Sequence, residues 1–231
     1  MNFINYLKKY KGFKNSMRDG RFNLHWKDRK LCLKDDTSGL GYDRHYIYHT
    51  AWAARILKET NPKEHVDISS IIYFNTILSA FIPIRFYDFR PPEIELSGLK
   101  TGKADLTNLD FTDNSIESLS CMHTVEHLGL GRYGDPIDPS ADKKACSELS
   151  RVLAKDGNLL FVVPVGKPKI MFNAHRIYSP KMIIEAFSEL QLKEFSLIPN
   201  KPNNTGIIKN PNDKMISEQT YAAGCFWFRK E

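Results

Sequence analysis

The stretch LLFVV at residues 159–163 is the most strand-like segment of this sequence. It is apolar at every position, which is typical of a central parallel strand that is buried on both faces. Apolar residues at helical spacing precede it, from Ala145 to Leu153, and Lys155-Asp156-Gly157 follows them. We expect Gly157 to end this helix in the left-handed conformation, so that the chain passes directly from a helix into a buried strand.

Strands and helices alternate along the rest of the chain. Alternation of this kind indicates a parallel α/β sheet, and two late strands without a helix between them indicate an antiparallel hairpin. We therefore predict a Rossmann-like, doubly wound, mostly parallel sheet with a C-terminal antiparallel hairpin. Further helices are predicted at 43–58, 71–82 and 179–190, and strands at 64–68, 84–88, 103–106, 116–122, 159–163, 192–198 and 221–228.

The positive charge is concentrated at one end of the chain. The 231 residues carry a formal net charge of +6, but residues 1–34 hold ten Lys and Arg and two Asp, which leaves the rest slightly acidic. We predict a basic N-terminal leader, residues 1–40, and a single domain, residues 41–231. Aromatic side chains among the basic residues allow a nucleic-acid-binding arm. Because no nucleic-acid motif accompanies them, we favour the alternative, a leader that packs on the domain.

Composition excludes several classes of protein. The longest apolar run, residues 159–165, contains Pro164 and is too short for a membrane span, and no secretory signal is apparent. We expect a cytoplasmic protein with no bound metal, and the sequence leaves its oligomeric state open. The cysteines fit neither a zinc pattern nor a disulfide framework, and we expect small buried thiols at Cys32, Cys121, Cys146 and Cys225.

Polar residues follow the predicted strands, at the edge where parallel sheets bind ligands. Asp67 comes with Ser69-Ser70 after the first strand, and Asp88 ends the second. A carboxylate at the end of the second strand is placed to accept hydrogen bonds from ribose hydroxyls, and one after the third, Asp105, from an adenine amino group. The later strands are followed by His123, His127, Asn173, His175 and Arg176.

Three stretches resemble class I S-adenosylmethionine-dependent methyltransferases. Residues 103–116, KADLTNLDFTDNSI, resemble the family's D-L-x-x-L-P-F-x-D-x-S-F-D segment. Residues 122–128, MHTVEHL, resemble its x-H-V-L-E-H strand end, and residues 148–159, ELSRVLAKDGNL, resemble E-L-x-R-V-L-K-P-G-G-x-L. A narrower resemblance, to the DUF268 group of such proteins, rests on EHLGLGRYGDP at 126–136 and FNAHRIY at 172–178.

The resemblance implies the class I methyltransferase fold and S-adenosyl-L-methionine as cofactor. The family's first strand usually ends D/E-x-G-x-G, whereas Ser69 and Ile71 stand at the glycine positions here, and a Cβ limits close approach of the backbone. G-x-G-x-x-G at 129–134 follows the fourth strand, so we interpret it as a mobile active-site loop rather than a dinucleotide fingerprint. The implied cofactor-binding residues are Asp67, Ser69, Ser70, Asp88, Asp105, Leu106 and His123.

A methyl acceptor with a hydroxyl group benefits from a general base, and histidine suits that role near neutral pH. His127 and His175 are the candidate bases, and a structural cap is the alternative for His127. Two arginines are candidates to clamp an anionic group, with surface ion pairs as the alternative. Polar aromatic residues between Tyr42 and His49 suggest a lid, with ordinary amphipathic packing as the alternative. The candidate substrate-binding residues are Arg132, Tyr133, Asp135, Asn173, Arg176 and Tyr178.

The resulting hypothesis is a methyltransferase acting on a small polar acceptor, the hydroxyl of a sugar or phosphorylated sugar-like metabolite, as in surface polysaccharide biosynthesis. The altered first motif supports an alternative, a degenerate methyltransferase fold that binds a ligand or partner without turnover. Only the basic leader supports nucleic-acid modification or binding, and we expect no nucleic-acid partner. The partner that we expect is a small-molecule substrate.

Overall fold

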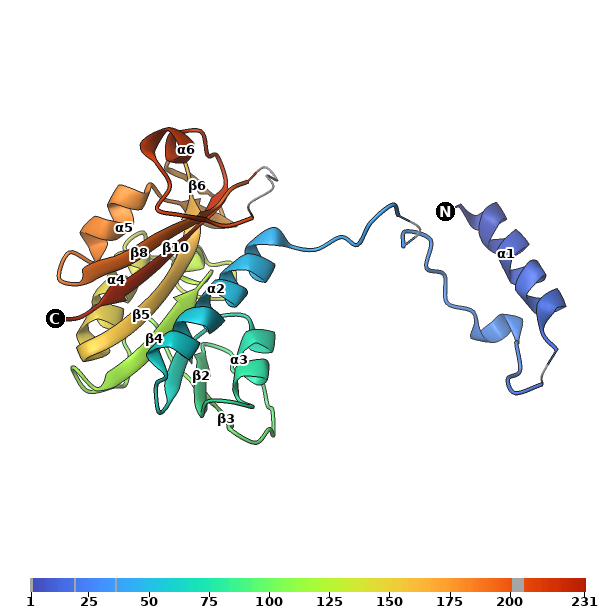
Figure 1. Ribbon diagram of the computed structural model, residues 1–231, viewed down its shortest axis with the longest axis horizontal. Coiled ribbons are helices and arrows are strands. Elements are labelled where there is room, and N and C mark those ends of the chain that lie inside the picture. The colour runs from blue at the N-terminus through green and yellow to red at the C-terminus, as the bar shows by residue number, and fades with distance from the viewer. Residues whose placement is uncertain (1, 19, 36, 201–205) are drawn as a thin grey trace. The chain divides into compact units, whose positions relative to one another are not determined.

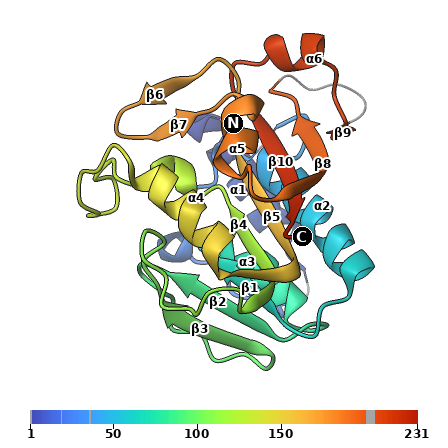
Figure 2. The ribbon, with the colours of Figure 1, turned by 90° about the vertical axis from the view of Figure 1, so that its left-hand side faces the viewer.

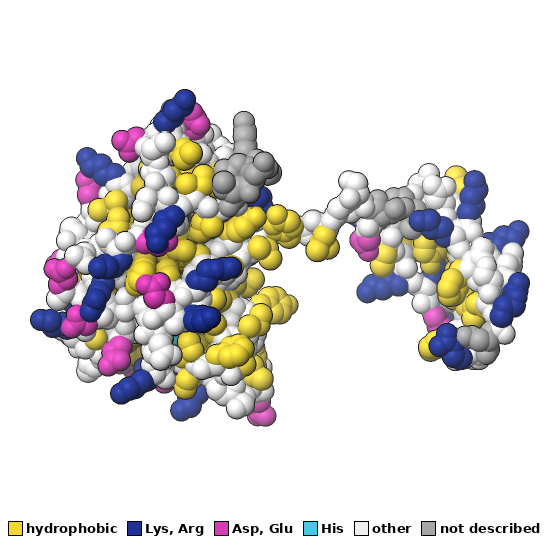
Figure 3. All heavy atoms as spheres, viewed as in Figure 1, with side chains coloured by type: hydrophobic (Ala, Val, Ile, Leu, Met, Phe, Trp, Pro, Cys, Tyr) yellow, Lys and Arg dark blue, Asp and Glu magenta, His cyan; other side chains and the backbone are white. Residues whose placement is uncertain are grey.

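The computed structural model describes residues 2–18, 20–35, 37–200 and 206–231. The chain divides into two compact units, Met1–Tyr42 and Asp43–Glu231 (Figure 1). The first unit contains helix α1 (Phe3–Ser16), whose N-cap Asn2 accepts a hydrogen bond from the backbone N–H of Asn5, and a single 3₁₀ turn (Trp26–Asp28). On the face seen in Figure 3, Lys and Arg side chains of this unit lie beside hydrophobic ones.

The second unit is built on an 8-stranded sheet in the order β3-β2-β1-β4-β5-β10-β8-β9. Strands β1 to β5 run parallel to one another, whereas β10 is antiparallel to both β5 and β8. This topology confirms the predicted fold class, including the antiparallel C-terminal pair. The strands are β1 (His65–Ile68), β2 (Ile84–Asp88), β3 (Leu99–Lys103), β4 (Ile116–Met122), β5 (Leu153–Val165), β8 (Gln191–Ile198), β9 (Ile208–Lys209) and β10 (Ala222–Arg229).

Helices cover both faces of this sheet. Helices α2 (Arg44–Thr60) and α3 (Ile72–Leu78) pack on one face, and α4 (Ala141–Val152) and α5 (Pro180–Ala186) on the other (Figure 2). Successive β5 side chains alternate between the two cores: Phe161 packs with α4 and α5, and Leu160 and Val162 pack with α2 and α3. The chain also forms a hairpin of β6 (Lys169–Met171) with β7 (His175–Ile177), and a short helix α6 (Asp213–Ser217).

The predicted caps are confirmed, whereas several predicted boundaries are wrong, and α5 ends at Ala186 rather than at residue 190. The side chains of Asp43 and Ser179 accept hydrogen bonds at the starts of α2 and α5. Helix α3 ends at Leu78 rather than at Ile82, because residues 79–82 tighten into a turn before Pro83. The third strand spans Leu99–Lys103 rather than 103–106, because Asp105 accepts hydrogen bonds from the next turn instead of continuing the sheet.

The predicted left-handed cap at Gly157 is also wrong. Helix α4 ends at Val152, and Leu153 already belongs to β5. The left-handed residue is Asp156, with φ 61°, and Gly157 is needed for a different reason. A Cβ at Gly157 would lie 2.7 Å from the carbonyl oxygen of Ala154 and 3.1 Å from that of Ile116, so only glycine fits between these backbones.

Three of the four cysteines, Cys121, Cys146 and Cys225, are buried free thiols as expected, whereas Cys32 is exposed. Within the described residues, no helix is both long enough and apolar enough to cross a bilayer. Residues 201–205 of the predicted polar loop, and Met1, Asp19 and Asp36 of the predicted leader, lie outside the described residues.

We expect Gly157→Ala to lower the free energy of unfolding by ~1–3 kcal/mol, because the added methyl group would overlap backbone atoms that cannot move independently of the sheet. Gly41→Ala is the matched control, since no atom lies within 4 Å of the position that its Cβ would take. Urea unfolding monitored by circular dichroism measures both. Equal midpoints for the two variants would contradict the close approach at Gly157.

Candidate functional site

A cavity of about 480 Å³ lies where strands β1 to β4 end. This is the edge at which open α/β sheets bind ligands, and the volume falls within the usual range of ligand pockets. Loops after four strands contribute to its wall, so segments far apart in the sequence converge there. The lining includes Tyr46, Ser69, Ser70, Ile71, Asp88, Phe89, Arg90, Asp105, Leu106, Met122, His123, Thr124, His127, Leu128, Tyr133, Asp135 and Asp138.

The two predicted carboxylates after β2 and β3 both reach the cavity. Asp88 accepts a hydrogen bond from the backbone N–H of Arg90 at 2.7 Å, and Asp105 accepts from the N–H of Thr107 at 2.9 Å. These local bonds hold each carboxylate in place beside the cavity. Leu106 supplies an apolar surface next to them.

Asp67, a predicted cofactor-binding residue, is not among the residues that line the cavity. The carboxylate is fully buried, where it accepts hydrogen bonds from Ser120 Oγ and from the N–H of Ser70. Ser120 Oγ in turn lies 2.8 Å from Nε2 of buried His65. Burial raises the pKa of Asp67 to about 6 and lowers that of His65 to about 3. Asp67 therefore joins β1 to β4 and shapes the loop that lines the cavity.

Ser69 has the backbone conformation that glycine favours. Its φ is 60°, its N–H donates to the carbonyl of Tyr87 at 2.7 Å, and its carbonyl accepts from Thr124 Oγ1 at 2.9 Å. Bonds to two neighbouring segments thus hold a serine in the left-handed region. The backbone turn that a glycine would make is therefore present at this position. Ser70 lines the cavity beside it, and its Oγ accepts from the N–H of Met122.

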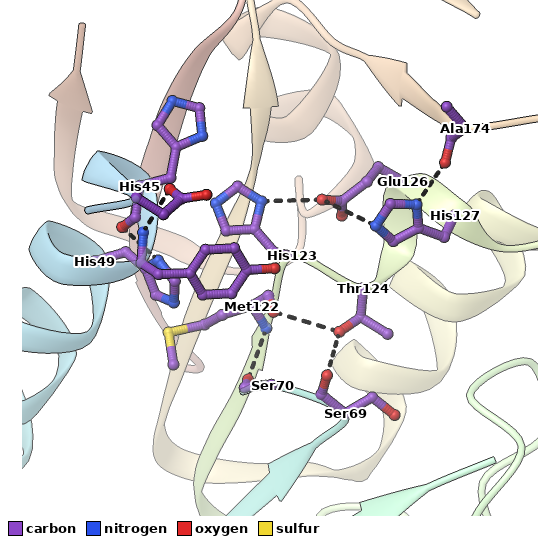
Figure 4. A network of polar contacts seen from close by, with 12 residues as sticks. His45, His49, Ser69, Ser70, Met122, His123, Thr124, Glu126, His127 and Ala174 are labelled. Carbon is purple, nitrogen blue, oxygen red and sulfur yellow. Dashed lines mark hydrogen bonds and ion pairs between the residues drawn. The ribbon is translucent and has the colours of Figure 1, made fainter. Parts of the chain in front are cut away.

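A buried pair, His123 and Glu126, lies at the end of β4 (Figure 4). Nδ1 of His123 is 3.0 Å from Oε1 of Glu126. Burial lowers the pKa of His123 to about 4 and raises that of Glu126 to about 7, so at neutral pH the uncharged ring donates its Nδ1–H to the carboxyl group. Within the described residues, Nε2 of His123 and Oε2 of Glu126 are buried without a hydrogen-bond partner. Such unsatisfied buried atoms are rare in folded proteins, and His123 is also part of the cavity wall.

His127 lines the cavity, whereas His175 is not among the lining residues. Nδ1 of His127 donates to the carbonyl of Ala174 at 2.6 Å, and its Nε2 lies 3.9 Å from Oε1 of Glu126 (Figure 4). A proton on Nδ1 leaves the lone pair on Nε2. His175, on β7, has its ring centroid 6.2 Å from that of His127 and 5.1 Å from that of Tyr221, and burial lowers its pKa.

The predicted substrate-binding residues separate into two groups. Tyr133 and Asp135 line the cavity, and Arg132 lies close by, with its guanidinium donating to the carbonyl of Ala174 at 3.1 Å. Asn173 is exposed in the turn between β6 and β7. Arg176 and Tyr178 do not line the cavity.

Arg176 and Tyr178, two predicted substrate-binding residues, are instead buried against α4. Arg176 donates to the carbonyl of Leu128 and pairs with Asp142 at 3.6 Å. The hydroxyl of Tyr178 donates to the same carboxylate at 3.1 Å. Nη1 and Nε of the Arg176 guanidinium thus face protein groups, whereas Nη2 is buried without a hydrogen-bond partner among the described residues. Together the two side chains hold β7 in place beside the cavity.

Sequence reasoning missed two groups at the site. Glu126 was visible only as part of the Glu-His pair, and its burial could not be read from that motif. Arg90 lines the cavity, with its guanidinium carbon 4.8 Å from the ring centroid of Tyr133. In the sequence, only its position directly after the second strand could have indicated a role at the site. In the segment predicted as a lid, Tyr46 lines the cavity, and the ring of His45 stacks on that of His123 with centroids 5.5 Å apart. Despite these histidines, no group of three or more His, Cys, Asp or Glu among the described residues could hold a metal ion.

We expect the free energy of unfolding of Glu126→Gln to increase relative to that of the wild type as the pH rises from about 5 to 8. The folded-state pKa of Glu126, about 7, lies above its ordinary value of 4.5. In the wild type, the protonated carboxyl group therefore makes its full contribution to the free energy of unfolding below pH 4.5. That contribution is lost as the pH rises through 7, because the buried group then ionises. Glutamine stays neutral and can still accept from His123.

Urea midpoints of both proteins across this pH range measure the effect. Glu117→Gln is the matched control, because it changes an exposed carboxylate on β4 that solvent screens. A difference between Glu126→Gln and wild type that does not change with pH would contradict the burial of a titrating carboxyl group at this site.

Comparisons with known proteins agree with this architecture. The family model described as "Caenorhabditis protein of unknown function, DUF268" matches residues 93–207, and no curated protein matches significantly. The N-methyltransferase NodS from Bradyrhizobium japonicum, in complex with S-adenosylhomocysteine, superposes with a TM-score of 0.57 at 12% identity, over 86% of this chain and 93% of that one.

Two further solved structures show the range of proteins with this architecture. The 1,6-didemethyltoxoflavin-N1-methyltransferase from Burkholderia thailandensis gives a TM-score of 0.53 at 12% identity, over 98% of this chain and 86% of its own. The [4+2]-cyclase SpnF superposes with a TM-score of 0.52 at 10% sequence identity, over 78% of this chain and 80% of the cyclase chain. The chain therefore has the fold of class I S-adenosylmethionine-dependent methyltransferases and matches the DUF268 family model over residues 93–207.

Proposed function

We propose that this protein is an S-adenosylmethionine-dependent methyltransferase that acts on a hydroxyl group of a small polar acceptor. The observation that carries the proposal is the cavity at the ends of β1 to β4, whose wall includes Asp88, Asp105 and His127. Its place at this edge of the sheet fits a nucleoside-containing cofactor. The fold alone does not specify the reaction, since the similar structures include N-methyltransferases and a cyclase.

The residues of the cavity fit S-adenosylmethionine. Asp88 is placed to accept from the ribose hydroxyls and Asp105 from the adenine amino group, with Leu106 against the base. The left-handed turn at Ser69 brings backbone toward the cavity as the usual glycine would. Ser70 and His123 complete this part of the wall, and Asp67 supports it from beneath. When bound, this cofactor supplies a methyl group on positively charged sulfur.

His127 is the base in this proposal. The Ala174 carbonyl holds the proton on Nδ1, so Nε2 is free to take the proton that an acceptor hydroxyl loses. Glu126, 3.9 Å from Nε2, stabilises the positive charge that the ring then carries. His175 lies outside the cavity wall, and we assign it a positioning role because its ring packs edge-on toward that of His127, with centroids 6.2 Å apart.

A sugar or phosphorylated sugar-like metabolite is the acceptor that we propose. Arg90 in the wall and Arg132 beside the Ala174 carbonyl supply positive charge for an anionic group, and Tyr133 offers a ring face for a sugar. A base at the cavity favours an oxygen acceptor, because a neutral amine is already nucleophilic. Surface polysaccharide biosynthesis is a process that uses such reactions.

The second candidate is a ligand-binding protein without turnover. It is favoured by one observation, the side chains of Ser69 and Ile71 at positions where the family has glycine. The two candidates differ in whether a labelled methyl group reaches any acceptor.

We expect S-adenosylhomocysteine to bind the purified protein, and Asp88→Ala to weaken that binding by ~100-fold or more, because hydrogen bonds to a charged acceptor contribute ~1.5–3 kcal/mol each. Calorimetric titration measures both affinities. Asp110→Ala, which removes an exposed carboxylate outside the cavity, should leave affinity unchanged. Failure of the wild type to bind at millimolar ligand would refute the proposal, and unchanged binding by Asp88→Ala would show that the ribose lies elsewhere.

We expect His127→Gln to retain S-adenosylhomocysteine affinity but to lower methyl transfer by ~10²–10⁴-fold, the usual contribution of a general base. Transfer of a labelled methyl group to a panel of sugars and sugar phosphates measures the rate. His175→Gln should have a smaller effect, since this ring does not line the cavity. Equal rates for His127→Gln and the wild type would remove His127 from the reaction.

A further inference from the structure

The first unit carries an amphipathic basic helix whose apolar side is largely uncovered. In α1, apolar and aromatic residues recur every three or four positions, at Phe3, Tyr6, Leu7, Tyr10 and Phe13. At 100° per residue they form one continuous stripe. Phe3, Leu7 and Phe13 are 46%, 39% and 64% exposed, so the packing of this unit leaves much of the stripe open to solvent.

Positive charge borders this stripe. The helix contains Lys8, Lys9, Lys11 and Lys14 and no acidic residue. The helical repeat places Lys9 at one edge of the stripe and Lys11 at the other, with Lys14 in line with the stripe in the last turn and Lys8 on the opposite side. Residues 1–34 as a whole hold ten Lys and Arg against two Asp, although the chain has a net charge of only +6. Long lysine side chains at the edges of an apolar stripe can extend their charged ends away from it.

Trp26 extends the apolar surface beyond the helix. Its ring packs edge-on against Tyr10, with centroids 5.0 Å apart, and lies at a tilt to the ring of Tyr6, with centroids 6.5 Å apart. Trp26 nevertheless remains 41% exposed. The guanidinium carbon of Arg29 lies 4.4 Å from the Trp26 ring centroid. The chain after α1 therefore folds back onto the stripe and adds an aromatic ring with a cation beside it. Tryptophan flanked by cations is typical of the membrane interface.

We propose that α1 and Trp26 form a docking surface for a bilayer that contains anionic phospholipids. The apolar stripe would enter the headgroup region, and the bordering lysines would contact lipid phosphates and carboxylates. Charge complementarity selects an anionic surface. The exposed aliphatic side chains of Ile4 and Leu7 favour a bilayer over nucleic acid, because they have no ring on which a base could stack. The surface lies wholly in the first unit and does not depend on the proposed methyl transfer.

Sedimentation with lipid vesicles tests this surface in the full-length chain. We expect binding to vesicles of phosphatidylcholine mixed with phosphatidylserine, weaker binding to phosphatidylcholine alone, and a loss of the difference in high salt. Lys9→Glu with Lys11→Glu should lower the partition coefficient more than ~10-fold, since each basic residue near such a surface contributes about 1 kcal/mol. The matched control is Lys100→Glu with Lys155→Glu, which makes the same charge change at exposed positions of the second unit and should alter binding by less than about twofold.

Tryptophan fluorescence tests whether the apolar side enters the lipid. Emission of the wild type should move to shorter wavelength when anionic vesicles are added, and Trp26→Phe should abolish the change while binding persists, because Trp52 is buried and Trp227 is part of β10. Leu7→Glu with Phe13→Glu should lower binding as well. Absence of vesicle binding in low salt, or equal binding by the lysine variants, would overturn the proposal. Lysine-dependent binding to a single-stranded oligonucleotide without vesicle binding would assign the surface to nucleic acid instead.

Discussion

Burial of β5 on both faces is the constraint on which the second unit depends. Phe161 faces the core beneath α4 and α5, and its neighbours Leu160 and Val162 face the core beneath α2 and α3. A strand with two apolar faces is stable only between two layers of helices. The parallel pairing of β4 with β5 then directs the end of β4, with its histidines, to the same edge as the ends of β1 and β2. The cavity is a consequence of this arrangement.

Buried polar groups beneath the cavity give it a defined shape. Asp67 and His65 connect β1 to β4 through Ser120, and Glu126 holds the ring of His123. Buried groups of this kind destabilise a fold unless they are hydrogen-bonded, so their partners restrict the loops to one arrangement. The same burial shifts the pKa values of Asp67 and Glu126 upward and of His123 downward. Stability and proton affinity at this edge of the sheet are therefore set by the same contacts.

Local patterns predicted the elements that depend on local chemistry. The caps at Asp43 and Ser179 were predictable because a side-chain oxygen bonds a backbone N–H three residues away. Boundaries that depend on contacts with residues distant in sequence were not predictable from local patterns. Gly157 was interpreted as a helix cap, but its lack of a Cβ is required by the carbonyls of Ala154 and Ile116. The third strand lies at Leu99–Lys103 because it pairs with β2, and no local signal marked that register.

The sequence by itself determined the fold class and which residues follow the strands, because periodicity and strand-end chemistry are local. It also brought Asp88, Asp105, His123 and His127 into one predicted site, and these four share the cavity wall. Only the tertiary structure decided which polar side chains reach the cavity and which are already paired. Arg176 and Tyr178 are held by Asp142, and Asp67 by Ser70 and Ser120, since partners distant in sequence compete for the same hydrogen bonds.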